Sequence, residues 1–174
     1  MNKIELNFSK SFLLKDVSNN CPNGGGIYLH YIKLGNNNNR IIYVGECQSF
    51  KLRQEEHLLC YKRNKYLLFE IENDELNVKY IPDYDTPEIL GNKFNELKEK
   101  TISNINVICG EIKNPANYNL KGIEGAIIIH LFRNQNTRKY LTSTQINYSL
   151  RNTMIVFDGL NNIINGLPNN INIQ

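Results

Sequence analysis

Four side chains that can handle a phosphate group lie between residues 26 and 57. Tyr28 and Tyr43 are phenols, Arg53 carries a guanidinium group and His57 carries an imidazole. Cleavage of a phosphodiester requires a base for the attacking water, positive charge on the phosphate and help for the leaving group. These side chains can fill such roles together with a metal ion held by a carboxylate. Their types and spacing therefore indicate phosphodiester hydrolysis, provided that the fold brings them together.

A β-hairpin would place the two phenols close to each other. The apolar runs 27–34 and 41–44 flank an Asn tetrad at 36–39, and Asn tolerates the positive φ that hairpin loops require. Tyr28 and Tyr43 then lie on paired strands. The pattern predicts an antiparallel strand pair with a slightly long connecting loop.

A helix after the hairpin would supply the guanidinium and the imidazole. Ser49 is a favourable N-cap for a helix from Phe50 to about Tyr61. Arg53 and His57 lie one turn apart in such a helix, so both project from one face. Taken singly, His57 is as easily a surface histidine, and the two tyrosines are as easily core residues with hydrogen-bonded hydroxyl groups.

The ordered motifs resemble those of the GIY-YIG nuclease family. Gly26-Ile27-Tyr28 matches the first triplet, and Tyr43-Val44-Gly45 matches the second, with Val as a common variant of Ile. The spacing Arg53-x-x-x-His57 resembles the helix of the GIY-YIG type II restriction endonucleases. The resemblance covers about residues 23–140.

The resemblance implies an α+β fold. We expect a single domain over residues 1–174, with a small, mainly antiparallel central sheet of three or more strands flanked by helices. N- and C-terminal additions and a helical insertion near 86–101 would extend the motif core. The other predicted elements are a strand within Met1–Phe12 added to the sheet, a loop at 17–25, strands at 66–72 and 76–81 of which the first completes the central sheet, a helix from Pro87 to about Thr101, strands at 105–112 and 154–157, a helix from Leu120 to about Arg133, and a frayed end at 169–174.

The resemblance also implies a metal ligand. Glu124 is the only carboxylate in the apolar helix predicted from Leu120, and a carboxylate buried there without a partner would be unfavourable. The family carries one Glu in such a helix, where it binds a single divalent ion, so we expect Glu124 to bind Mg²⁺ or Mn²⁺. The alternative is a first-turn charge that interacts with the helix dipole. Asn136 resembles the final motif residue, with Asn134 and Asn147 as competing candidates.

The resemblance implies a role for each of these residues. Tyr28 would accept a proton from the attacking water, directly or through His57, while Arg53 stabilises the phosphate. Tyr43 would hold a water molecule or the phosphate edge, and Asn136 would brace the site through hydrogen bonds. We expect the metal, Arg53 and a hydrogen bond to His57 to lower the pKa of Tyr28 from its ordinary value of about 10.

One residue departs from the family pattern. Glu46 directly follows Gly45, where some members have a basic residue, so Lys51 or Lys33 would have to replace that charge. Three further residues receive ordinary structural interpretations: His30 and His130 as strand and helix residues without evident partners, and Tyr61 as a packing residue that could also reach the edge of the site.

Charge and composition permit a nucleic-acid partner. The net charge is +3 and the pI is about 8.6, which is mildly basic. Lys51, Lys62, Arg63 and Lys65 cluster in and just after the predicted helix, and we interpret them as DNA contacts; the alternative is a solvated helix face. The four cysteines show neither zinc-site nor disulfide spacing. Without a signal-peptide core or an apolar run near the roughly 20 residues of a membrane helix, we expect a cytoplasmic protein.

The sequence thus predicts a divalent-metal-dependent endonuclease that hydrolyses DNA. The closest resemblance is to type II restriction enzymes, which act on double-stranded DNA as homodimers at palindromic sites. Two alternatives remain: a structure-specific or single-strand nuclease of DNA repair or mobile elements, and a nucleic-acid binding module that does not cleave.

Overall fold

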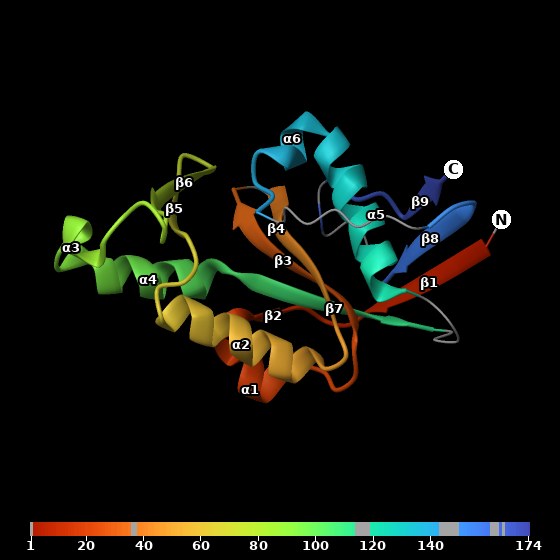
Figure 1. Ribbon diagram of the computed structural model, residues 1–174, viewed down its shortest axis with the longest axis horizontal. Coiled ribbons are helices and arrows are strands. Elements are labelled where there is room, and N and C mark those ends of the chain that lie inside the picture. The colour runs from red at the N-terminus through yellow and green to blue at the C-terminus, as the bar shows by residue number, and fades with distance from the viewer. Residues whose placement is uncertain (1, 36–37, 114–118, 143–149, 161–163, 165) are drawn as a thin grey trace.

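The computed structural model describes residues 2–35, 38–113, 119–142, 150–160, 164 and 166–174 (Figure 1). These residues form an α+β fold. Its elements are β1 (Asn2–Phe8), β2 (Phe12–Leu13), η1 (Leu14–Asp16), α1 (Val17–Asn20), β3 (Gly26–Leu34), β4 (Asn38–Cys47), α2 (Phe50–Lys62), β5 (Leu68–Glu72), β6 (Glu75–Tyr80), α3 (Pro87–Leu90), α4 (Lys93–Asn104), β7 (Asn106–Ile112), α5 (Leu120–Arg133), α6 (Gln135–Arg138), β8 (Thr153–Asp158) and β9 (Asn170–Ile173).

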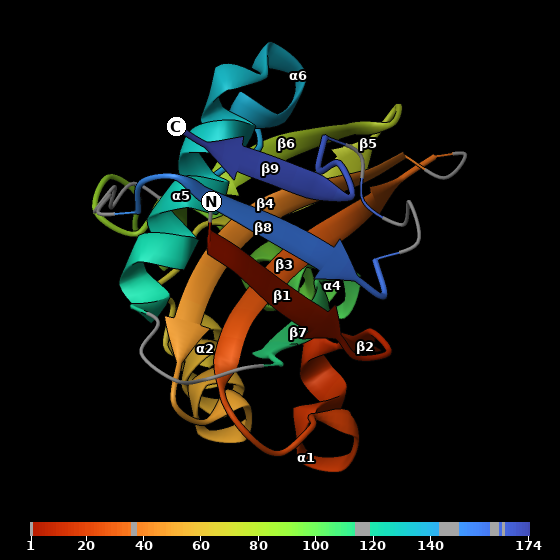
Figure 2. The same ribbon diagram turned by 90° about the vertical axis from the view of Figure 1, so that its right-hand side faces the viewer.

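A seven-stranded sheet forms the centre of the fold. Its order is β4-β3-β7-β1-β8-β9, and β2 also pairs with β7. The pairs β3–β4, β3–β7, β1–β7 and β8–β9 are antiparallel, whereas β1 and β8 are parallel. Figure 2 shows that the sheet curls from β4 round to β9. The predicted α+β class with a mainly antiparallel sheet is confirmed, and the N-terminal strand joins the sheet as expected.

The two faces of β3 contribute to two separate cores. Leu29 and Tyr31 pack on the side of α5, while Tyr28 and Ile32 pack on the side of α2 and α4. This division follows from the two-residue period of a strand. A register shift between His30 and Tyr31 marks a β-bulge in the hairpin, and bulges redirect side chains on the strand that carries the extra residue.

The β5–β6 pair corrects one sequence-based prediction. We expected the first strand, at 66–72, to complete the central sheet, but β5 and β6 form a separate two-stranded sheet. Asn73 and Asp74 both have positive φ, which gives a tight turn and pairs β5 with β6. The backbone of Phe69 also bonds to the Thr101 hydroxyl of α4 at 3.0 and 2.9 Å. The backbone hydrogen-bonding groups of β5 therefore find their partners in β6 and α4, away from the central sheet.

Three other predictions require correction. The helix expected from Pro87 to about Thr101 is divided into α3 and α4, because Gly91 adopts a φ of 52° that ends the first segment. The end at 169–174 is not frayed, since β9 pairs with β8. The loop expected at 17–25 begins with the short helix α1. The strands at 105–112 and 154–157 and the helix from Leu120 are confirmed.

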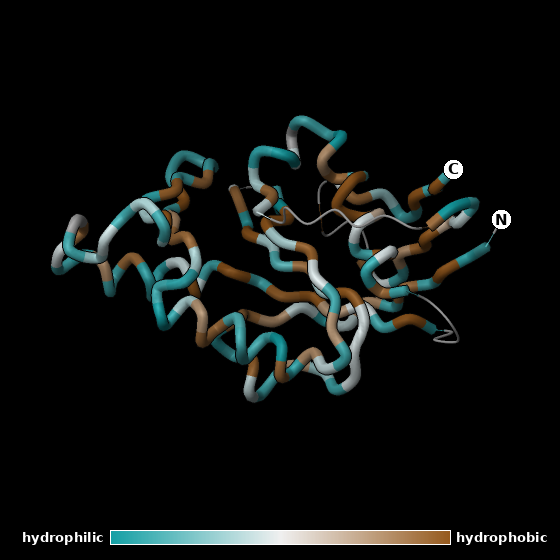
Figure 3. The backbone as a smooth tube through the Cα atoms, in the orientation of Figure 1, coloured by the Kyte–Doolittle hydropathy of each residue, from teal (hydrophilic) through white to brown (hydrophobic). Residues whose placement is uncertain are grey.

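Hydropathy follows this architecture. Figure 3 shows hydrophobic residues along β7 and in the body of α5, and mainly hydrophilic residues along α2. Among the described residues, no helix combines the length and the apolar character needed to cross a membrane.

Candidate active site

Tyr28 lies at the centre of a buried polar cluster. Its hydroxyl group is 2.8 Å from Nε2 of His57 and accepts a hydrogen bond from Nε of Arg53 at 3.2 Å. The ring of Tyr43 stacks on the Tyr28 ring with centroids 6.0 Å apart, and lies 5.2 Å from the His57 ring. The structure therefore brings together the four side chains selected from the sequence.

The hairpin register explains how the phenols meet. Tyr28 lies opposite Gly45, and His30 lies opposite Tyr43. A Cβ atom at Gly45 would come within 2.2 Å of the Tyr28 hydroxyl oxygen, so only glycine leaves space for this ring to cross β4. The second glycine of the motif thus has a direct steric role beside the proposed base.

The helix α2 presents the other two groups. Its N-cap Ser49 accepts a hydrogen bond from the backbone N–H of Leu52, as predicted from the sequence. Arg53 and His57 follow one turn apart and face the hairpin. The His57 side chain is 2% exposed, which rules out the simple surface-histidine interpretation.

Burial determines the protonation of the two central groups. Burial, followed by the neighbouring Tyr43, raises the pKa of Tyr28 well above its usual range, and Arg53 only partly opposes this effect. Arg53 lowers this pKa as expected, but burial outweighs it, so our expectation of a net lowering is wrong. Burial, His30 and Arg53 lower the pKa of His57 to about 2. A neutral phenol thus lies against a neutral imidazole, whose bare nitrogen can accept the phenol proton.

Arg53 is held by two partners, the Tyr28 hydroxyl group and the Glu56 carboxylate. Burial favours a lower pKa for its guanidinium group, but hydrogen bonds to Glu56 and Tyr28 outweigh burial and raise the pKa. Its Nη1 atom contacts Glu56 Oε2 at 2.8 Å, in a pair that is largely exposed. Glu56 was not selected from the sequence. Its carboxylate occupies one arm of the guanidinium fork, which a phosphate oxygen could take instead.

Glu124 lies on α5, across the edge strand β4 from the tyrosine cluster. It is the fifth residue of α5, and no acidic residue occupies the first turn, so the alternative interpretation as a first-turn charge is wrong. Burial, followed by the negative charge of Glu46, raises the pKa of Glu124 to about 7, while Lys121 and Arg53 oppose the shift. Glu124 is therefore within electrostatic reach of both Glu46 and Arg53.

A divalent ion would fit this arrangement with few protein ligands. Among the described residues, no group of three or more His, Cys, Asp or Glu side chains could hold a metal ion. Mg²⁺ and similar ions commonly use only one or two carboxylates, with water and substrate phosphate completing the shell. Glu124, with Glu46 nearby, supplies such a donor set, and a bound cation would relieve the repulsion between the two carboxylates.

The predicted Asn136 is not brought to the other site residues by the described fold. It belongs to α6, and Figures 1 and 2 place α6 at the end of α5 opposite to the first turns that carry Glu124. The side chain of Asn136 and all of Asn147 lie outside the described structure. Asn134 is the exposed C-cap residue of α5, at the same end as α6.

The four predicted DNA contacts are exposed but do not form a single patch. Lys51 lies in the first turn of α2, whereas Lys62, Arg63 and Lys65 lie at or beyond its last turn. The rise of an α-helix separates Lys51 from Lys62 by about 17 Å, with the Arg53–His57 segment between them. Lys33 pairs with Asn39 near the hairpin loop, remote from Gly45, so Lys51 is the better replacement for the basic residue.

A second buried polar pair escaped the sequence analysis. His30 is 2% exposed, and its Nε2 lies 2.6 Å from Oε1 of the fully buried Gln54. The His30 ring is also 4.7 Å from the His57 ring. Our interpretation of His30 as a strand residue without a partner is therefore wrong. Two signals pointed to this pair: His30 shares its strand face with Tyr28, and Gln54 lies one turn before His57.

Tyr61 and His130 remain from the sequence analysis. Tyr61 packs against Tyr66 with ring centroids 5.0 Å apart, so it lies beside the site rather than at Tyr28. His130 is half-buried on α5.

Comparisons with protein-family models, with curated proteins and with solved structures find no match for this chain. The functional argument therefore depends on the geometry of the site.

Proposed function

We propose that this protein is a divalent-metal-dependent endonuclease that hydrolyses DNA, of the GIY-YIG type. One observation carries the proposal: a buried phenol, Tyr28, lies within hydrogen-bonding distance of both the His57 imidazole and the Arg53 guanidinium. A structural tyrosine needs only one such partner. A tyrosine that takes a proton from water and passes its own proton to a base, beside a phosphate anion, requires both an imidazole and a guanidinium partner.

The proposed proton path starts at the attacking water. In neutral His57 with the proton on Nδ1, Nε2 accepts the O–H of Tyr28. A lone pair of the phenol oxygen is then available for a proton of the water, while the phenol's own proton passes to His57. This relay does not require an ionised phenol at neutral pH, which agrees with the raised pKa of Tyr28. It leaves His57 as an imidazolium, so it requires the negative charge of a bound phosphate to raise the pKa of His57 from about 2.

Arg53 and Tyr43 would bind the substrate. The Arg53 guanidinium can hold the scissile phosphate through two parallel N–H bonds and stabilise the charge that develops on it. Tyr43 borders both Tyr28 and His57, so its hydroxyl group can orient a water molecule or a phosphate oxygen. A Mg²⁺ or Mn²⁺ ion at Glu124, assisted by Glu46, would polarise the phosphate when bound.

Two kinds of DNA substrate are proposed. The Arg53-x-x-x-His57 spacing favours a type II restriction enzyme that cuts double-stranded DNA as a homodimer at a palindrome. A cavity of about 420 Å³ beside Tyr43 and His57 favours the second candidate, a nuclease for single-stranded or structured DNA.

Incubation of the protein with plasmid and with single-stranded phage DNA in Mg²⁺ tests the proposal. Discrete bands from the plasmid indicate restriction, and selective loss of the single strand indicates the second candidate. The same reactions in EDTA test the metal requirement. Absence of cleavage, with DNA binding retained, would instead identify a binding module.

A further inference from the structure

The cavity next to the catalytic cluster has no role in the proton path. Its volume of about 420 Å³ is within the range of ligand-binding pockets. One wall is shared with the site, because His30, Tyr43 and His57 contribute to it. An occupant would therefore contact His57, which lies on the Tyr28 hydroxyl group together with Arg53.

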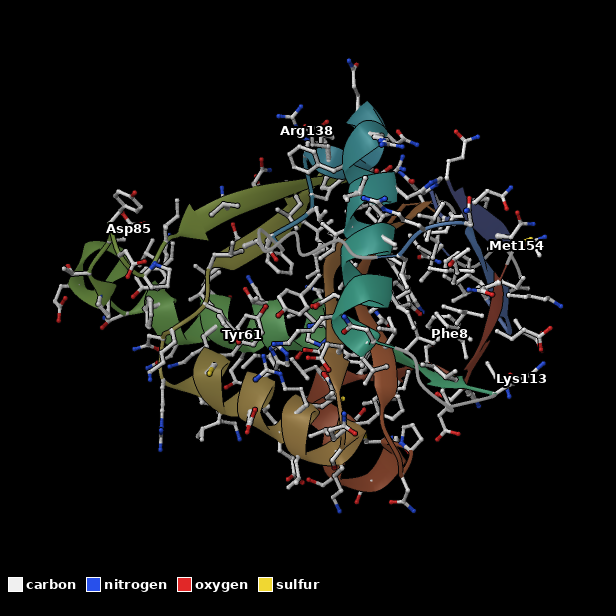
Figure 4. The ribbon with its side chains drawn as sticks, turned by 45° about the vertical axis from the view of Figure 1, so that its right-hand side comes forward. Phe8, Tyr61, Asp85, Lys113, Arg138 and Met154 are labelled. Atoms are coloured by element: carbon white, nitrogen blue, oxygen red, sulfur yellow. The ribbon has the colours of Figure 1, made fainter. Side chains whose placement is uncertain are left out.

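The other walls are aromatic and aliphatic. Tyr61 and Tyr66 extend the ring cluster outward from His57, with successive centroid distances of 5.6 and 5.0 Å. Figure 4 shows Tyr61 on the side of α2 that faces the β5–β6 pair, and Leu76 and Val78 of β6 line the opposite wall. The β5–β6 pair, which is separate from the central sheet, thus closes the cavity.

Charged groups lie among this lining. Lys65 and Lys139 contribute to the wall together with Asp83. Lys139 also lies 4.8 Å from the centre of the Tyr140 ring, another part of the wall. Aromatic and aliphatic surfaces with lysines among them are suited to a flat heteroaromatic group attached to phosphates.

We propose that this cavity holds one unpaired nucleobase of the DNA strand whose neighbouring phosphate lies at Arg53. The inference rests on the proposed function, because that function places the phosphate. A base inside a duplex has both faces covered and cannot enter a recessed pocket. The preferred substrate therefore has an unpaired nucleotide next to the cleaved bond, and a fully paired target has to release one.

Binding measurements in EDTA, where a metal-dependent nuclease does not cut, test the pocket independently of cleavage. Two labelled hairpin duplexes would be compared by fluorescence anisotropy, identical except that one carries a single unpaired adenine. We expect the unpaired substrate to bind about tenfold more tightly, the effect of one stacked base. Equal affinities would overturn the proposal.

Variants of the cavity wall test whether the cavity causes the preference for the unpaired base. Val78→Trp inserts a ring into the cavity from a residue that is 44% exposed, so it should leave the core intact and abolish the preference. Tyr84→Trp adds the same ring at an 85% exposed position outside the cavity lining and should retain the preference. Tyr66→Leu should weaken the preference more than Tyr66→Phe, which keeps the stacking ring. A preference that survives in Val78→Trp would refute the pocket assignment.

The outcomes separate the two proposals. Cleavage in Mg²⁺ without any preference for the unpaired base would support the nuclease proposal and refute the pocket proposal. A binding preference for the unpaired base in EDTA, without cleavage in Mg²⁺, would support the pocket proposal and refute the nuclease proposal.

Discussion

Both faces of β3 carry buried side chains, but the two faces contain different chemistry. On the α5 side the core is almost entirely aliphatic, and the Tyr31 hydroxyl finds one partner, Ser11, at 3.0 Å. On the α2 side, Tyr28 lies among polar and ionisable groups, of which His30, Gln54 and His57 are buried and Arg53 is partly exposed. Burial of such groups is unfavourable unless they are paired. Their concentration on one face, at the edge of the sheet, is what distinguishes a candidate site from a core.

Gln54 strengthens this contrast. Its Nε2 is one of two buried side-chain atoms without a hydrogen-bond partner in the described structure. It lies beside the site, on the α2 face, and its Oε1 faces His30. An incompletely satisfied polar group is tolerated more readily near a functional site than in a core that only stabilises the fold.

The largest expected effect compares Tyr28 with Tyr31, two buried phenols on one strand. Tyr28→Phe should reduce the cleavage rate by about 10³- to 10⁴-fold, because Phe cannot relay a proton. Tyr31→Phe should leave the rate near that of the wild type. Single-turnover rates on one DNA substrate, with circular dichroism to check folding, would measure both. Similar losses in the two variants would remove the distinction between the two faces.

Replacement of Glu124 tests the carboxylate on the α5 side. Glu124→Gln should reduce cleavage by about a thousandfold, since a metal ion contributes several kcal/mol to the transition state, while DNA binding in EDTA persists. Because the pKa of Glu124 is raised to about 7, a proton must leave before metal binds. The apparent metal affinity of the wild type should fall about tenfold per pH unit below about pH 7. Calorimetry with Mn²⁺ at several pH values would measure this affinity. An affinity that does not change with pH would show that Glu124 is not the ligand.

The same raised pKa has a consequence for stability. The folded state holds the Glu124 proton more tightly than the unfolded state, so this contribution to stability is complete below the ordinary carboxyl pKa. It is lost as the pH rises through about 7. Above that pH, metal-free Glu124→Gln should be more stable than the wild type by about 1 kcal/mol, a value discounted because the group is only half-buried. Urea denaturation at pH 5 and pH 8 would compare the two proteins.

A smaller effect is expected at Arg53. Arg53→Lys keeps the positive charge but loses the planar fork that binds two phosphate oxygens, so cleavage should fall by about a hundredfold. Thermal melting should change little, because the side chain is partly exposed. Arg138→Lys, on α6, is a matched control that should leave the rate unchanged. If the two variants behave alike, Arg53 is only a surface cation.

The smallest effect should separate Tyr43 from Tyr28. Tyr43→Phe loses one hydrogen bond but retains the relay, so a decrease of about tenfold is expected. The cleavage rates of the wild type and of Tyr43→Phe should rise through about pH 7, as Glu124 loses its proton. The rates should then stay level to about pH 9, since the relay uses a neutral phenol. A rate that continues to rise tenfold per pH unit would indicate an ionised phenolate base instead.

Local signals in the sequence were sufficient for much of this protein. Short-range rules predicted the β3–β4 hairpin, the start of α2 at Ser49 and the body of α5, because loop chemistry, capping and apolar runs act over a few residues. The same rules placed Tyr28, Tyr43, Arg53 and His57 in one cluster, since all four lie on two elements that follow each other directly.

Contacts between distant segments decided the rest. Thr101 of α4 binds the backbone of β5 away from the central sheet. The C-terminal segment is a strand because β9 pairs with β8. Neither contact has a signal in the segments themselves. The protonation of Tyr28, His57 and Glu124 was also beyond the sequence, because pKa values respond to burial and to charges that other elements bring close. The sequence by itself therefore determined which groups are available in the Tyr28 cluster, and the tertiary structure determined which of them carry protons.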